Sequence, residues 1–283
     1  MLWMAASGAL FTVLNAIMKK LSHELDPWLV GFLRYLFGAL VMLLPMLRER
    51  GRGLLPRAPK LQFVRGLFHA GGMLLWFAAL PLVTLAEMTA IGFSGPLFIC
   101  IGATMFLRER MNGARWTAVL VGFIGVMLVV RPWEGGGFQG GSPGLLMMLA
   151  AAPVFAASFL VAKALTRHDR SEVIVLWQHL WVSILLLPVA LTAWTTPSTL
   201  QWLLLMLCGL LGAGGHFCMT LAFRVADISA VQSLKFLELI WAALLGFAMF
   251  GTVPAGWTVA GGLVILVSTL WLARSESRAA GAK

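Results

Sequence analysis

Residues 27–47 read PWLVGFLRYLFGALVMLLPML, an apolar run in which Arg34 is the one charged side chain. The run matches the roughly 20 residues that an α-helix needs to cross the hydrocarbon core of a bilayer. Backbone groups in lipid must be hydrogen-bonded within the segment, so the run predicts a helix. A membrane barrel strand would instead be shorter and would alternate apolar with polar residues.

Similar runs fill the rest of the chain, and each ends at charge, Pro or Gly. Of the 283 residues, 60% are hydrophobic and 11% are charged, whereas a soluble domain carries about 25% charged residues. The sequence therefore predicts an all-α membrane protein with ten transmembrane helices. They are expected at residues 2–19, 27–47, 64–82, 86–107, 114–131, 143–163, 172–194, 199–223, 228–250 and 255–273.

The basic residues predict the orientation of these helices. The net charge is +10, and if the N-terminus is cytoplasmic, most of the 21 Lys and Arg fall on the inner side, with Arg34 and Lys235 within spans. Lys19, Lys20 and Arg131 then lie outside, as the positive-inside rule favours. We therefore expect both termini in the cytoplasm of a cell with a bacterial-type inner membrane. We expect no nucleic-acid partner, because no basic binding motif is visible.

An internal repeat divides the chain into two halves. Ala70–Gly72 recurs as Ala213–Gly215, and a proline and a Trp-Thr pair recur at nearly the same spacing. The two five-helix repeats are predicted at residues 1–135 and 143–273, followed by a cytoplasmic tail at 274–283. An odd number of spans inverts the second repeat relative to the first. Inverted repeats are typical of transporters, whose substrate site lies near the midplane between the halves.

Phe32–Tyr35, Gly95–Phe98 and Phe106–Arg110 lie at characteristic places in the second and fourth spans. With these stretches the chain resembles the EamA-type ten-helix branch of the drug/metabolite transporter superfamily. Arg108 stands where that family often has a glycine, directly before a glutamate. The resemblance implies export of amino acids or other metabolites. The inverted repeats predict alternating access through a central cavity.

Charged side chains within the spans are the first candidates for substrate contact, because charge in a membrane is costly and usually faces protein or water. Arg34 would meet a substrate carboxylate, or would instead bond a neighbouring helix. Lys235 and Glu238 share one helix face. They would contact the substrate or form a structural ion pair, and Glu238 is alternatively a proton carrier.

Histidine and deep aromatic residues complete the candidate set. A histidine in a span either bonds within the core or titrates near neutral pH. Deep aromatic rings either pack the core or line a pocket for aromatic or bulky apolar solutes. The predicted substrate-binding residues are Arg34, His69, Trp76, Phe93, Ser94, Trp177, Gln178, His216, Lys235, Glu238 and Trp241.

Two further features concern motion and assembly. Gly95 and Pro96 are the predicted hinge, because proline removes a backbone hydrogen bond and bends a helix. Small residues recur every fourth position at Ala114, Ala118 and Gly122. They favour close helix packing, either inside a monomer or at the seam of a homodimer.

Other function classes fit less well. Gly92–Gly95 resembles a rhomboid nucleophile site, with Ser94 as the nucleophile and His179 or His216 as a base. The duplicated layout does not suit such a protease, and no ion-filter loop is visible. We therefore predict a transporter and not an enzyme, with no cofactor and no metal. Amino acids are the first expected cargo, and nucleosides, sugars or nucleotide-like metabolites are the alternatives.

Overall fold

The computed structural model describes residues 2–48, 54–79, 82, 94–109, 111–130, 143–238, 240, 241, 244 and 256–281. Every element within these ranges is helical. The α-helices are α1 (Leu2–Leu21), α2 (Pro27–Arg48), α3 (Pro59–Ala79), α5 (Gly95–Phe106), α6 (Gly113–Val130), α7 (Pro143–Leu165), α8 (Ser171–Thr192), α9 (Thr199–Val225), α10 (Ile228–Gln232) and α12 (Gly256–Gly281). A 3₁₀ turn, η2 (Ser233–Phe236), follows α10 directly.

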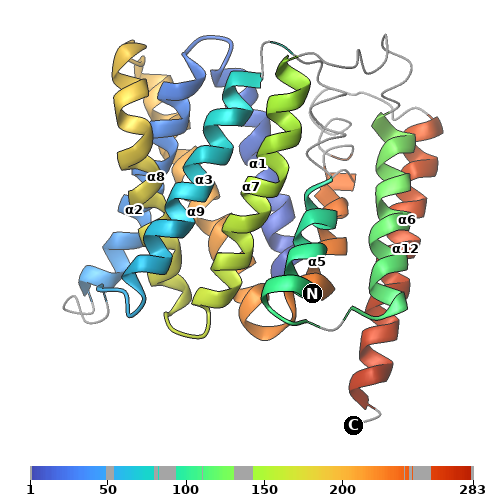
Figure 1. Cartoon of the computed structure of the whole chain (residues 1–283). Helices are drawn as coiled ribbons and strands as arrows, with labels where there is room; N and C mark the ends of the chain where they lie inside the picture. Colours follow the sequence, from blue (N-terminus) through green and yellow to red (C-terminus); the bar gives the residue numbers. More distant parts are fainter. Residues whose placement is uncertain are drawn as a thin grey trace.

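The helices stand side by side, and the chain reverses direction from one helix to the next (Figure 1). Four of them, α2, α7, α8 and α9, contain segments long and apolar enough to cross a membrane. Shorter apolar stretches lie in α1, α5, α6 and α12. This composition agrees with the predicted all-α membrane protein.

One side of the bundle carries most of the charge that the structure describes. The helices α2, α5, α7 and α9 end on this side, where α3, α6, α8 and α10 begin (Figure 1). We call it the basic end because Arg57, Arg115, Arg167 and Arg224 lie there.

Several element boundaries differ from the predicted ones. The third helix begins at Pro59 instead of residue 64, so Gln62 also lies within α3. Of the predicted span 86–107, α5 accounts for Gly95–Phe106, and residues 86–93 lie outside the described part. Of the predicted span 228–250, α10 covers only the start before the chain tightens into η2. Such 3₁₀ turns close poorer hydrogen bonds than an α-helix and are used in short pieces.

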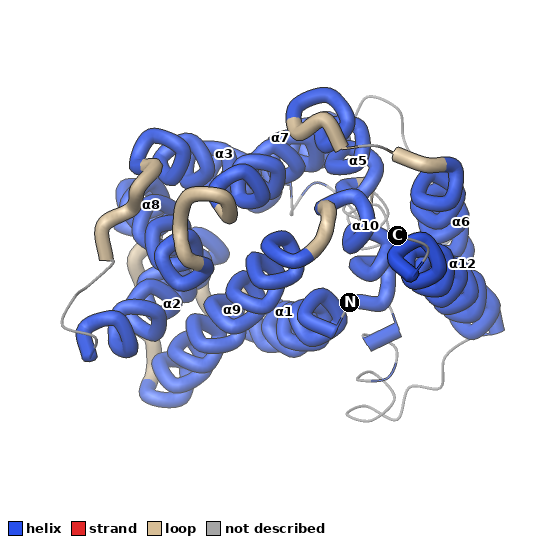
Figure 2. The backbone as a smooth tube through the Cα atoms, turned by 90° about the horizontal axis from the view of Figure 1, so that it is seen from below, coloured by secondary structure: helices blue, strands red, loops and turns tan. Residues whose placement is uncertain are grey.

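The strong helix contacts join the first part of the chain to the second. The helix α3 packs on α7, and α1 packs on α9; α2 contacts α9, and α3 contacts α8. The helices α2 and α8 also pack on each other, as do α6 and α12, which lie together at one edge in Figure 2. Exchanging α1, α2, α3 and α6 with α7, α8, α9 and α12, in that order, turns this set of contacts into itself.

Glycines permit the closest of these approaches. A Cβ atom added at Gly209 of α9 would overlap Phe37 and would lie 2.8 Å from the backbone nitrogen of Gly38 in α2. A Cβ at Gly122 of α6 would overlap the ring of Phe236. The predicted small-residue stripe of the fifth span is thus used at Gly122 for a contact inside the monomer.

Candidate functional site

Four aromatic rings from four different helices meet in the middle of the bundle. They belong to Tyr35 of α2, His69 of α3, His179 of α8 and His216 of α9, and we call them the ring cluster. None is more than 3% exposed. The hydroxyl of Tyr35 lies 2.7 Å from Nε2 of His69. The ring centroids of Tyr35 and His179 are 5.1 Å apart, and His216 lies 5.4 Å from each of the other two histidines.

The cluster contains polar atoms that the described residues leave unpaired. Nδ1 of His179 lies 2.8 Å from the carbonyl oxygen of Val175, but its Nε2 has no partner there. Neither ring nitrogen of His216 has a hydrogen-bond partner within the described part of the chain. A buried polar group without a partner costs about 1–3 kcal/mol. Such atoms are therefore suited to a polar ligand.

Two buried arginines flank the rings. The guanidinium of Arg34 lies 4.6 Å from the centroid of the Tyr35 ring, and its Nε has no hydrogen-bond partner among the described residues. Arg65 is fully buried, donates to the carbonyl oxygen of Ile174 over 2.9 Å, and also bonds Oε1 of Gln178. No ion pair of either arginine is found within the described ranges. Their positive charge favours an anionic or electron-rich partner.

The candidates on the ninth span lie close to α7 and α1. Nζ of Lys235 lies 5.2 Å from the ring centroid of Phe159, and that ring is 6.1 Å from His69. The backbone carbonyl of Glu238 accepts a 3.5 Å hydrogen bond from Thr12. The described contacts include no ion pair between Lys235 and Glu238. Nε1 of Trp241 is buried without a partner in the same described set.

Three other candidates have different surroundings. Trp76 packs in the apolar core against Ala79 and Met148. Trp177 donates from its Nε1 to the carbonyl oxygen of Leu54 over 2.8 Å, which fastens α8 to the segment before α3 at the basic end. Gln178 holds Arg65. The indole N–H of Trp177 is thus bonded at the basic end, whereas Gln178 is linked to the cluster through Arg65.

The predicted hinge stands at the start of a helix. Gly95 begins α5, with Ser94 as its N-cap residue and Pro96 in the first turn. Proline in a first turn interrupts no intrahelical hydrogen bond, so the described segment is not kinked there. Phe93 lies outside the described residues.

The predicted substrate-binding residues did not include Tyr35, Arg65, Ser158 or His179, which lie in or next to the ring cluster. Ser158 Oγ donates to the carbonyl oxygen of Arg65 and lies 3.3 Å from Nδ1 of His69. Tyr35 is the only tyrosine of the chain and directly follows Arg34, which was a usable signal. Arg65 was counted with the cytoplasmic basic residues, although the predicted span 64–82 already included it.

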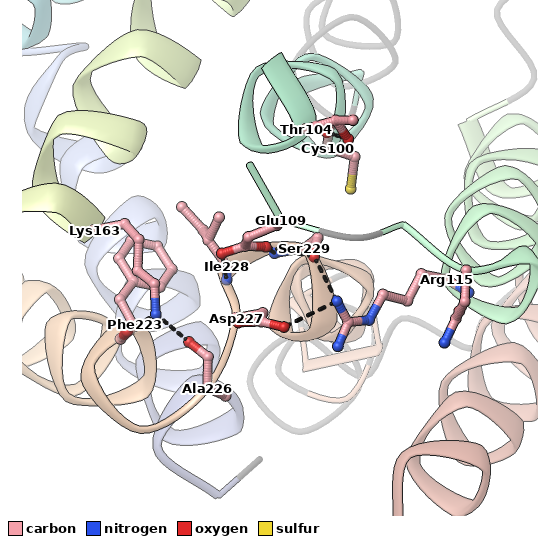
Figure 3. Close-up of polar contacts among 11 residues, drawn as sticks. Cys100, Thr104, Glu109, Arg115, Lys163, Phe223, Ala226, Asp227, Ile228 and Ser229 are labelled. Carbon is pink, nitrogen blue, oxygen red and sulfur yellow. Dashed lines mark hydrogen bonds and ion pairs between the residues drawn. The ribbon is translucent and has the colours of Figure 1, made fainter. Parts of the chain in front are cut away.

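A second polar group joins the two parts of the chain at the basic end (Figure 3). Its members are Glu109, Arg115, Lys163, Asp227 and Ser229, and we call it the end network. The carboxylate of Glu109 accepts hydrogen bonds from the backbone nitrogens of Ile228 and Ser229, at 2.9 and 3.1 Å, and from the Ser229 hydroxyl at 2.6 Å. It thereby caps the start of α10, where a negative charge is favourable.

The remaining bonds of the end network reinforce this contact. Arg115 NH1 forms a 3.0 Å ion pair with Asp227 and donates to the Ser229 hydroxyl over 3.2 Å. Nζ of Lys163 donates to the carbonyl oxygens of Phe223 and Ala226, at 2.6 and 2.7 Å, where α9 ends. The network therefore fastens the end of α5 and the start of α6 to the connection between α9 and α10.

Arg108 links the end network to helix α5. It adopts a φ of 55°, in the left-handed region that favours glycine. The next residue, Glu109, donates its backbone N–H back to the carbonyl oxygen of Ala103 over 3.1 Å. This turn directs the Glu109 carboxylate to α10, which explains why a glycine before the glutamate suits the position.

Comparisons with known proteins agree with this architecture. The model of the EamA-like transporter family matches residues 1–131 and 142–274. A riboflavin transporter of Rhizobium johnstonii is 34% identical over 98% of this chain and 91% of its own length. An S-adenosylmethionine uptake transporter of Rickettsia prowazekii is 28% identical over 99% of the chain and 94% of its own length. A pseudopaline exporter of Pseudomonas aeruginosa is 26% identical, covering 94% of the chain and 93% of the exporter.

A solved crystal structure shares the fold, with a TM-score of 0.83 at 19% sequence identity, covering 97% of this chain and 96% of the other. The family match extends over almost the whole sequence and includes both parts that the end network joins. Members of this family are transporters. The chain belongs to the EamA-like transporter family.

Proposed function

We propose that this protein carries a small metabolite across a bacterial inner membrane by alternating access between two inverted five-helix halves, residues 1–135 and 143–273. Two observations support this division into halves. The family model matches the chain in two stretches with nearly these bounds. The helix contacts also form a set that is unchanged when the halves are exchanged.

The ring cluster is the proposed substrate site. The observation that carries this assignment is that α2, α3, α8 and α9 each bring one polar ring to the same point, with unpaired nitrogens on His179 and His216. Tyr35 and His179 stand equally far from the first residues of α2 and α8. They therefore lie at equivalent positions of the two halves, where an inverted-repeat transporter binds its solute.

The described conformation would be a closed one. Ring centroids about 5–6 Å apart are in van der Waals contact, which leaves no room for a solute between them. The end network at the same time fastens the halves together at the basic end. If the termini are cytoplasmic, this end faces the cytoplasm. Rocking of the halves would break the network and separate the rings in one movement.

A flat heteroaromatic solute suits the cluster best. Such a ring could stack between Tyr35 and His216, and its polar atoms would meet the unpaired nitrogens. Arg34 would lie next to an electron-rich carbonyl or a carboxylate of the solute. Riboflavin, which the relative from Rhizobium johnstonii transports by name, carries a flat ring system of this kind.

Amino acids with bulky aromatic side chains are the second candidate. The observation that favours them is the buried guanidinium of Arg34 without an ion pair in the described residues, which suits a substrate carboxylate. Lys235 beside Phe159 offers a second cation for the same group.

The test is uptake by purified protein in liposomes, with labelled riboflavin, S-adenosylmethionine, tryptophan and a sugar, each with and without a pH gradient. Saturable uptake of riboflavin above tryptophan supports the first candidate, and the reverse order supports the second. Dependence on the gradient would identify proton coupling. Folded protein that moves none of these solutes, and no metabolite from a wider panel, would contradict the transport function itself.

A further inference from the structure

A pocket lies at the basic end, away from the ring cluster. Its volume is about 270 Å³, and it is lined by the segment before α3, the turn between α7 and α8, and the end of α9. This volume is below the roughly 300–1,000 Å³ of pockets for drug-sized ligands. It suits a group of a few atoms.

The lining is strongly basic. Arg57, Arg167, Arg170 and Arg224 all contribute to it, together with His168. Arg170 lies 3.5 Å from Glu172, which compensates its charge. For the side chains of Arg57 and Arg167, the described residues provide no hydrogen bond or ion pair.

Asp169 is the one acidic residue of the lining, and its carboxylate is engaged in the wall. It accepts hydrogen bonds from the backbone nitrogen of Arg57 at 2.6 Å and from Nε2 of Gln62 at 2.9 Å, and the residue is 5% exposed. Its backbone oxygen accepts a further bond from Arg224, whose Nε also donates to the Ser171 hydroxyl over 3.3 Å. Arg224 is therefore held in place at the pocket by two acceptors that carry no charge.

We propose that this pocket binds a phosphate group, and that its source is the headgroup of an anionic lipid. Guanidinium groups bind phosphate through paired, charge-assisted hydrogen bonds. Basic pockets between transmembrane helices at the cytoplasmic side are places where anionic headgroups bind. The pocket opens at the ends of α7 and α9, where those helices would leave the bilayer. A bound headgroup would fasten the α7–α8 turn to the segment before α3.

The test measures binding of short-chain phosphatidylglycerol by its effect on thermal unfolding of the purified full-length protein in a neutral detergent. The double variant Arg57→Gln/Arg167→Gln removes two exposed charges from the pocket. Each basic residue near an anionic membrane surface contributes about 1 kcal/mol, so the apparent Kd should rise about 30-fold. The matched control is Lys20→Gln/Arg274→Gln, which removes two exposed charges elsewhere and should leave the Kd unchanged.

Two further probes distinguish the sources of the phosphate. Inorganic phosphate that stabilises the wild type and loses its effect in the pocket variant would show a phosphate site that needs no lipid. Phosphatidylcholine, which has no net charge, should bind weakly and equally to all forms. Equal weakening of phosphatidylglycerol binding in the pocket and control variants, or no weakening in either, overturns the proposal. If the double variant is unstable, Arg167→Gln alone should raise the Kd about fivefold.

Discussion

Removing the Glu109 carboxylate should open the basic end of the bundle. Glu109 accepts three hydrogen bonds from Ile228 and Ser229, and these bonds exist only while the end of α5 rests on the start of α10. Glu109→Ala leaves both backbone donors at the start of α10 without this partner. The equilibrium should therefore shift toward conformations in which the two segments are apart.

The size of the shift follows from the contacts. A hydrogen bond to a charged group contributes about 1.5–3 kcal/mol, but Glu109 is only half-buried, and water replaces part of this when the contact opens. We take about 2 kcal/mol for the three bonds together, which corresponds to a roughly 30-fold increase in the open population. Glu109→Gln keeps one acceptor oxygen and should give a smaller increase.

Cys100 is a natural reporter of this opening. It lies on α5 above the end network, with its thiol pointing toward it (Figure 3), and it is fully buried. In a Cys208→Ala/Cys218→Ala background it is the sole thiol. Its reaction rate with a water-soluble maleimide then reports the open fraction, and we expect it to rise about 30-fold in Glu109→Ala.

The matched control is Glu24→Ala. The Glu24 carboxylate accepts a 2.7 Å hydrogen bond from Gln201 at the opposite end of the bundle, so its loss should not accelerate labelling of Cys100. Labelling of folded Glu109→Ala within twofold of the parent protein, or equal acceleration in Glu24→Ala, would show that Glu109 does not hold this end closed.

Three further outcomes are expected. Arg108→Gly should raise the thermal stability in detergent by about 0.5–1 kcal/mol, because a side chain at a φ of 55° is strained; a lower Tm would contradict this. Gly209→Ala should destabilise the protein by about 1–3 kcal/mol through overlap between α9 and α2, whereas Gly262→Ala, with open space around it, should not lower the Tm; equal Tm values would argue against the close approach. Tyr35→Phe removes the hydroxyl bonded to His69 and should weaken solute binding about fivefold, measured as half-saturation of transport by folded protein; unchanged half-saturation would place the substrate elsewhere.

The helical membrane fold could be predicted because long apolar runs leave a helix as the structure that satisfies the backbone in lipid. Arg34, His69 and His216 could be selected for a related reason, since polar side chains are costly at such depth. The start of α3 was predicted too late because Lys60 and Gln62 make its first turn polar, although Gln62 is fully buried in the bundle. A hydropathy pattern therefore assigns such residues to a loop.

The partners of the candidate residues could not be predicted from one sequence. Glu109 belongs to the stretch Phe106–Arg110, which resembles the family. Its contacts with Ile228 and Ser229, however, depend on how distant helices pack. Trp177 was selected as a deep aromatic residue, yet its indole N–H is used to fasten α8 to Leu54. Residue type and depth thus identify which side chains are unusual, and the packing of the helices decides which of them meet.

The ring cluster is proposed to bind the transported solute. The most direct measurement is counterflow in liposomes preloaded with the unlabelled solute that the uptake panel identifies, comparing His216→Phe with His23→Phe. His216 has two unpaired ring nitrogens within the described structure, whereas His23 is an exposed histidine between α1 and α2. We predict that His216→Phe loses counterflow while His23→Phe keeps the wild-type rate. Full counterflow by folded His216→Phe, with unchanged half-saturation, would contradict the assignment.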